Sequence, residues 1–163
     1  DFMKKLILFL ISLILIGCSE NGISVPPDIP INQLLSSPDT ILIDTRHLYL
    51  STYIWRDFQP VSPPDGQPLI AIIYITAADT AQLPGSISAD AVWTVYNNKV
   101  WKSWFTNEAI SPSELKPNRL VKIARNGPKW GPHVYVDVIV RVLDGKGGTQ
   151  LLRASRQWIN RTD

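Results

Sequence analysis

The chain has 163 residues, of which 45% are hydrophobic and 18% charged, and its formal net charge is +2. This length predicts one folded domain with enough chain for a substantial core. The only cysteine is Cys18, which excludes a fold held together by internal disulfides, so stability must come from burial of apolar side chains.

The N-terminal stretch has the pattern of an export signal. Lys4 and Lys5 precede residues 6–16, which are apolar except for Ser12. This run is too short for a bilayer-spanning helix, which needs about 20 apolar residues, but suits the apolar part of a secretory signal. Leu15-Ile16-Gly17-Cys18 follows directly and resembles the lipobox of bacterial lipoproteins.

This resemblance implies a lipoprotein signal peptide at residues 1–18. Cleavage before Cys18 and acylation of its thiol and amine would attach two or three acyl chains, which give stable membrane anchoring. In similar lipoproteins an aspartate after the cysteine favours the inner membrane, so Ser19 favours the outer membrane of a bacterial cell envelope. The alternative is an ordinary secretory signal with a chance cysteine.

Residues 19–39 are predicted to form a tether. Four prolines lie among polar residues and glycine in this stretch, namely Pro26, Pro27, Pro30 and Pro38. Because proline fixes φ and lacks a backbone donor, the stretch is expected to be extended and semi-rigid, with at most one helical turn at residues 32–35.

Residues 40–163 show short β-type segments at regular spacing, separated by turn residues. The segments are 41–45, 48–58, 69–76, 91–96, 100–105, 120–125, 134–143, 149–154 and 157–161. They predict an all-β domain of eight or nine strands, arranged as an antiparallel two-sheet sandwich. The pattern resembles immunoglobulin and fibronectin type III domains, and a small β-barrel is the alternative fold.

Two local patterns are especially specific. Asn97 and Asn98 separate two strand segments, and asparagine tolerates positive φ, so a tight hairpin is expected there. In the later segment 134–143 every second residue is valine, which predicts one strand face buried in the core. The valines are Val134, Val136, Val138, Val140 and Val142.

Six tryptophans are the main candidates for ligand contacts. Trp130 lies in Gly127-Pro128-Lys129-Trp130-Gly131-Pro132, where a stiff loop would hold an indole for stacking on a sugar or a protein. We therefore predict ligand contacts for Trp130 and for Trp101 or Trp104. The alternative is that the indoles cap the ends of the core, which is expected for most of the six. Arg56, beside Asp57, is either a further ligand contact or part of a structural ion pair.

No motif of enzymatic chemistry is visible, so no catalytic residue and no cofactor are predicted. His133 and Asp137 share a strand face but are separated by about 13 Å of strand, too far for one metal ion. His47 is the only other histidine, so no metal site is predicted.

Charge divides the chain into unequal halves. Residues 18–98 contain eight acidic and two basic residues, whereas residues 99–163 contain five acidic and twelve basic ones. One interpretation is a basic face for an anionic partner such as lipopolysaccharide. The favoured one is that acidic early strands and basic late strands lie together and neutralise each other, and no nucleic acid partner is expected.

Together these features predict a non-catalytic, lipid-anchored envelope protein whose β-sandwich is a binding module for another envelope component, a protein or a glycan. The alternatives are a carbohydrate-binding module that uses exposed tryptophans and an envelope hydrolase.

Overall fold

The computed structural model describes residues 25–163, so the predicted signal 1–18 with Cys18 lies outside the described residues. Residues 25–163 form eight strands, one short α-helix and one 3-10 turn. The elements are α2 (Ile31–Leu35), β1 (Thr40–Ile43), β2 (Arg46–Asp57), β3 (Leu69–Ala77), β4 (Ser88–Tyr96), β5 (Lys99–Trp104), η1 (Pro112–Glu114), β6 (Arg119–Gly127), β7 (Tyr135–Leu143) and β8 (Thr149–Thr162). The all-β prediction is confirmed.

The strands form one hydrogen-bonded sheet in the order β5-β4-β7-β8-β2-β3-β6, with β1 paired to β2. All neighbouring pairs are antiparallel except β2 and β8, which run parallel. β1 occupies one edge of β2 at residues 46–49, and β8 occupies the same edge at residues 54–57. The sheet is therefore mixed rather than purely antiparallel, because the late strand β8 fills an edge that the short strand β1 leaves open.

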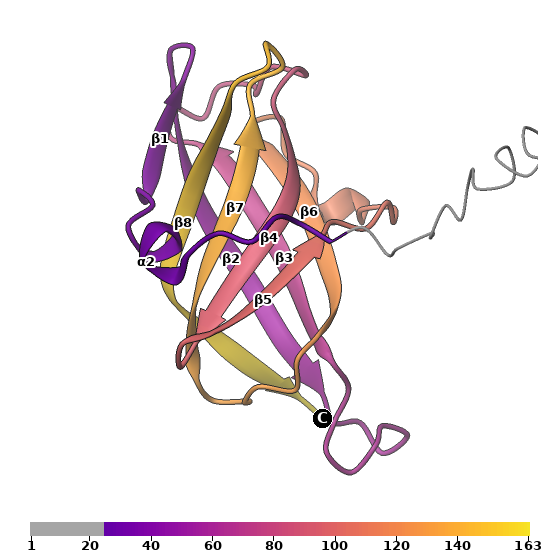
Figure 1. The fold of residues 1–163 in the computed structure, drawn as a ribbon. Coiled ribbons are helices and arrows are strands. Elements are labelled where there is room, and N and C mark those ends of the chain that lie inside the picture. The colour runs from indigo at the N-terminus through magenta and orange to yellow at the C-terminus, as the bar shows by residue number, and fades with distance from the viewer. Residues whose placement is uncertain (1–24) are drawn as a thin grey trace, which may run out of the picture.

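The sheet curls until its two end strands, β5 and β6, come close to each other (Figure 1). The amide of Thr106, just after β5, donates to the carbonyl of Ile123 on β6 at 2.9 Å. Apolar residues from seven of the strands fill the inside of the curl as one continuous core. The inside of the curl is therefore filled by side chains.

The hairpin prediction is confirmed, and the buried valine face is confirmed for four of the five predicted valines, because Val134 precedes β7 and is only half-buried. Asn97 and Asn98 have φ values of 46° and 59°, and they join β4 to β5 in a hairpin. On β7 the four valines within the strand are at most 2% exposed and belong to the core. These are Val136, Val138, Val140 and Val142. A fully valine face is well suited to this position because β-branched side chains pack closely on a pleated surface.

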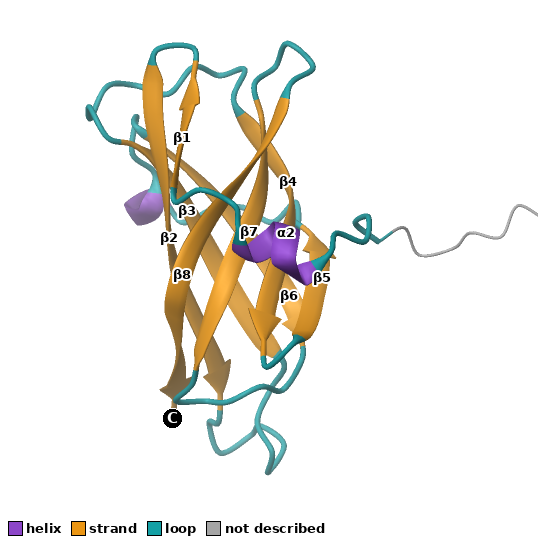
Figure 2. Cartoon of the chain, turned by 60° about the vertical axis from the view of Figure 1, so that its left-hand side comes forward, coloured by secondary structure: helices purple, strands orange, loops and turns teal. Residues whose placement is uncertain are grey.

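A second apolar cluster lies outside the curl, on β4 and β7, where residues 25–39 cover it. Leu34 of α2 and Trp93 of β4 are both 0% exposed. The indole Nε1 of Trp93 donates to the carbonyl of Pro27 at 3.1 Å, and Asp28 pairs with Lys102 at 2.6 Å. Figure 2 shows α2 lying across this outer face. The described part of the stretch for which a tether is predicted therefore lies against the domain.

Ion pairs connect the acidic first half of the chain to the basic second half. Four of them do so at nitrogen–oxygen distances of 2.5–2.7 Å. They are Asp28–Lys102, Asp65–Lys129, Asp90–Arg141 and Asp44–Lys146. These ion pairs favour the interpretation that the two halves neutralise each other, rather than the interpretation that the second half forms a basic face for an anionic partner.

Candidate functional site

The indoles of Trp130 and Trp101 lie half-buried against the core. The Trp130 ring is 5.6 Å from the Tyr96 ring, and the Trp101 ring packs so closely on Gly127 that a Cβ there would come within 3.0 Å of it. Both indoles therefore cap the core inside the curl. Capping of the core was the alternative to ligand contact in the sequence analysis.

Trp104 is half-buried in the outer cluster, next to the fully buried Trp93. The guanidinium of Arg141 lies 5.5 Å from the Trp104 ring and 6.0 Å from the Trp93 ring. Arg141 is itself paired with Asp90 at 2.7 Å. Trp104 is therefore part of a layered contact that helps to hold residues 25–39 on the sheet.

Arg56 is 3% exposed and points to the end of the curl. Its guanidinium donates to four backbone carbonyls, those of Gln67 at 2.9 Å, Lys129 at 3.1 Å, Gly131 at 2.7 Å and Asp65. The neighbouring Asp57 is not among its partners. This geometry assigns Arg56 a structural role, in which it connects loop 58–68 to loop 128–134.

The exposed indole of the described chain is that of Trp158, which is 40% exposed on β8. Its ring lies 4.8 Å from that of Tyr135 and 5.8 Å from that of His133. Asp137 pairs with Arg153 at 3.2 Å instead of approaching His133. Within residues 25–163 no group of three histidine, cysteine or acidic side chains is arranged to hold a metal ion.

Two depressions of the outer surface lie on β2, β3 and β6. Positions along β2 alternate, so that Leu48, Leu50 and Ile54 enter the core while Tyr49, Tyr53 and Trp55 point outward. Tyr53 and Trp55 have ring centroids 5.2 Å apart. The two depressions flank this pair of rings, and we call them together the outer groove.

The first depression has a volume of about 480 Å³. Its lining combines an indole with charged and amide side chains, namely Trp55, Asp57, Gln67, Pro68, Ile70, Arg125 and Asn126. The second depression has a volume of about 570 Å³ and is lined by Ser51, Thr52, Tyr53, Ile72, Tyr74, Glu114 and Arg119. Each depression therefore contains at least one aromatic ring, one arginine and one carboxylate.

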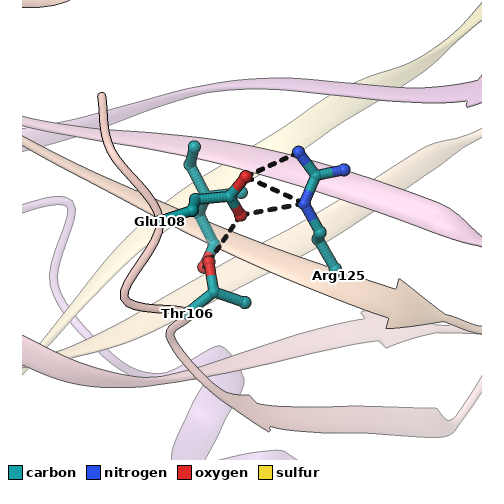
Figure 3. Close-up of polar contacts among 4 residues, drawn as sticks. Thr106, Glu108 and Arg125 are labelled. Atoms are coloured by element: carbon teal, nitrogen blue, oxygen red, sulfur yellow. Dashed lines mark hydrogen bonds and ion pairs between the residues drawn. The ribbon is translucent and has the colours of Figure 1, made fainter. Parts of the chain in front are cut away.

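Arg125 is held in place from the segment that follows β5. Figure 3 shows Glu108 facing its guanidinium, with Thr106 donating to the same carboxylate. Arg125 Nε lies 2.8 Å from Glu108 Oε1, and Nη2 lies 2.7 Å from Oε2. The hydrogen bonds from Arg125 and then from Thr106 lower the pKa of Glu108, so the carboxylate stays charged at neutral pH. Arg125 Nη1 has no acceptor within the described chain.

Arg119 and Tyr74 form the corresponding contact in the second depression. The guanidinium of Arg119 lies 4.8 Å from the centre of the Tyr74 ring. Its Nε is buried without an acceptor among residues 25–163. Burial, followed by a hydrogen bond to the Glu114 carboxylate, raises the pKa of Tyr74. Glu114 is the last residue of η1, whose preceding residue Ser111 makes no side-chain cap.

Unlike the neighbouring Arg56, the residues of the outer groove were not predicted as ligand contacts, although the sequence contains a signal for them. Residues 49, 53 and 55 are aromatic at strand spacing and alternate with aliphatic residues, which places them on one face of β2. Which face is inside depends on the neighbouring strands, since both faces of this segment are apolar.

No protein-family model, no curated protein and no solved structure matches the chain. Fold and site alone define its class: an all-β domain with an open, mixed aromatic and polar groove on the outer face of a curled sheet. Within residues 25–163 no helix has the length and hydropathy needed to cross a membrane.

Proposed function

We propose that the protein is a non-catalytic, lipid-anchored binding module of a bacterial cell envelope, and that its outer groove holds another envelope component. The supporting observation is the composition of the groove. Aromatic rings supply contact area at low entropy cost, and arginine and carboxylate side chains supply directional hydrogen bonds. The volumes of the two depressions fall in the range of about 300–1,000 Å³ that is typical of small-molecule pockets, which combine apolar walls with a few polar groups.

The finer fold assignment is part of this proposal. The β5-β4-β7-β8 part of the sheet and the β2-β3-β6 part share one core, so the two parts are proposed to act as the two layers of an immunoglobulin-like sandwich. Such a sandwich exposes its outer strand faces to ligands while the core stays rigid.

Anchoring rests on the sequence Leu15-Ile16-Gly17-Cys18. Cells grown with a clickable palmitate are expected to label the wild-type protein and to leave the Cys18→Ser variant unlabelled, because the thiol is the proposed acceptor. A variant at Ser19, such as Ser19→Ala, keeps the lipobox and should label normally. Label retained by Cys18→Ser would contradict the lipoprotein assignment.

Binding through the outer groove is tested by photo-cross-linking in intact cells. A photoreactive phenylalanine analogue at Tyr53, which is 43% exposed, is expected to give a discrete higher-mass adduct. The same analogue at Val61, which is 91% exposed in the loop after β2, is the matched control and should give none. The Tyr53 adduct should disappear when Trp55→Ala is added. Adducts from Val61 alone, or no adduct from Tyr53, would contradict the assignment.

A further inference from the structure

The two depressions of the outer groove are neighbours with a repeated composition. On the β2–β3 ladder Tyr53 pairs with Ile72 and Trp55 pairs with Ile70, so the depressions occupy consecutive outward positions. Two residues of a strand span about 6.6–6.8 Å, so groups in the two depressions are close enough to belong to directly linked units of one ligand. A ligand made of repeating units is the simplest match to a repeated site.

The polar groups indicate what such a unit carries. Arg125 uses Nε and Nη2 on Glu108, which leaves Nη1 free among the described residues and fixed in direction. The Nε of Arg119 is buried without an acceptor in the described chain, and the Arg119 guanidinium lies against the Tyr74 ring. Guanidinium donors beside carboxylate acceptors can bind adjacent hydroxyl groups, which both donate and accept. The unit therefore carries several hydroxyl groups.

The charged residues that line the two depressions favour a neutral ligand over a charged one. The first depression contains Arg125 and Asp57, and the second contains Arg119 and Glu114. Each depression thus has one cation and one anion in its lining. A charged ligand would be attracted by one of these groups and repelled by the other in each depression, whereas the hydroxyl groups of a neutral ligand can donate to the carboxylate and accept from the arginine.

The shape of the outer groove favours a glycan over a protein as the ligand. A stable protein interface buries about 800 Å² on each partner over a continuous surface. Here the surface is divided into two small concavities by the Tyr53 and Trp55 rings. The apolar C–H face of a sugar ring fits against an aromatic ring, and its hydroxyl edge reaches the polar lining.

We infer that the outer groove binds a neutral oligosaccharide chain, with successive sugar units in the two depressions and the Tyr53 and Trp55 rings stacking against them. This inference rests on the proposed binding function and names its ligand. Trp55, Tyr53 and Tyr74 are contact residues, and Arg125 and Arg119 are the hydrogen-bond donors. Glu108 is a positioning residue, because it acts only by fixing the Arg125 guanidinium.

Calorimetric titration of the purified full chain tests this inference. The probes are linear neutral oligosaccharides of glucose and of N-acetylglucosamine, one to six units long, with galacturonic acid oligomers of the same lengths as the anionic series. At least one neutral series is expected to bind, with affinity rising at least tenfold from one unit to three units. Trp55→Ala and Arg119→Met are each expected to weaken binding at least tenfold, and Trp55→Phe is expected to retain most of it.

Trp158→Ala is the matched control, since Trp158 is an exposed indole outside both depressions. It should bind the oligosaccharides as the wild type does. Absence of binding by the wild type, preference for the anionic series, equal affinity for one and six units, or loss only in Trp158→Ala would each overturn the inference. If the Tyr53 cross-link persists while no neutral sugar binds, the binding function stands and the glycan assignment fails.

Discussion

Replacing Arg56 with methionine is expected to lower the free energy of unfolding by about 3 kcal/mol, because each hydrogen bond from a charged donor contributes roughly 1.5–3 kcal/mol net and four carbonyls lose their donor. Some of these carbonyls would regain water, which limits the loss. For a domain of this size the melting temperature should fall by about 10 °C. Urea unfolding followed by circular dichroism measures the change.

The Arg56→Lys variant tests whether the positive charge of Arg56 or the shape of its guanidinium stabilises the two loops. Lysine keeps the positive charge but lacks the planar fork that reaches four carbonyls, so it should recover less than half of the loss. Arg161→Met is the matched control. The Arg161 guanidinium lies 4.0 Å from the centre of the same Phe58 ring that Arg56 contacts, but it is exposed and pairs with Asp163. Equal destabilisation by Arg56→Met and Arg161→Met would contradict the structural role given to Arg56.

Replacing Leu34 with aspartate is expected to release residues 25–39 from the outer face without unfolding the sheet. Leu34 is fully buried against Ala91, Trp93 and Ile139, and truncation of a buried leucine alone costs roughly 2–5 kcal/mol. A buried carboxylate adds a desolvation cost. Since the inner core is a separate cluster, detachment of the segment limits the total loss.

Three observations distinguish this detachment from global unfolding. Limited proteolysis should cut residues 25–38 at least tenfold faster in Leu34→Asp than in the wild type, and binding of a hydrophobic dye should increase because Trp93 becomes exposed. The far-ultraviolet circular dichroism should stay that of a β protein. Gln33→Asp, at an exposed position of the same helix, should behave as the wild type. Cooperative loss of all strand signal in Leu34→Asp would show that the segment is integral to the domain.

The strands were predictable because their signal is local. Alternation of valine on β7 and the Asn97-Asn98 turn each depend on a few neighbouring residues, and both predictions are confirmed. The parallel pairing of β2 with β8 was not predictable, because it depends on which edge remains open after β1 has paired. Alternation within a strand indicates which residues share a face, but it does not indicate which other strand will pair with that strand.

The exposure of the tryptophans was also not predictable from local sequence. The Gly-Pro pairs around Trp130 do indicate a stiff loop, but stiffness does not say toward which side the loop turns, and the indole turns toward Tyr96 and the core. For Arg56 the sequence offered an ion pair or a ligand contact, and two of the carbonyls that surround it, those of Lys129 and Gly131, come from a loop distant in sequence. The clamp of Glu108 on Arg125 likewise joins two segments separated by a long loop.

One part of the outer groove is predictable from the sequence and another part is not. Tyr53 and Trp55 share a strand face by simple alternation, so their proximity is contained in the sequence. Asp57 also lies on β2, but Tyr74, Glu114 and the two arginines come from β3, η1 and β6. The sheet order β2-β3-β6 brings these residues together. A site of this kind follows from topology, which local patterns do not encode.

The central claim is that the ligand lies over Tyr53, Trp55 and Tyr74, and hydroxyl-radical footprinting in intact cells tests it without knowledge of the ligand. Oxidation of these three side chains is expected to fall at least threefold in cells relative to the purified protein. Oxidation of Tyr135 and Trp158, which lie outside the groove, should stay unchanged. Equal oxidation of Tyr53, Trp55 and Tyr74 in both samples, or protection confined to Tyr135 and Trp158, would contradict the account.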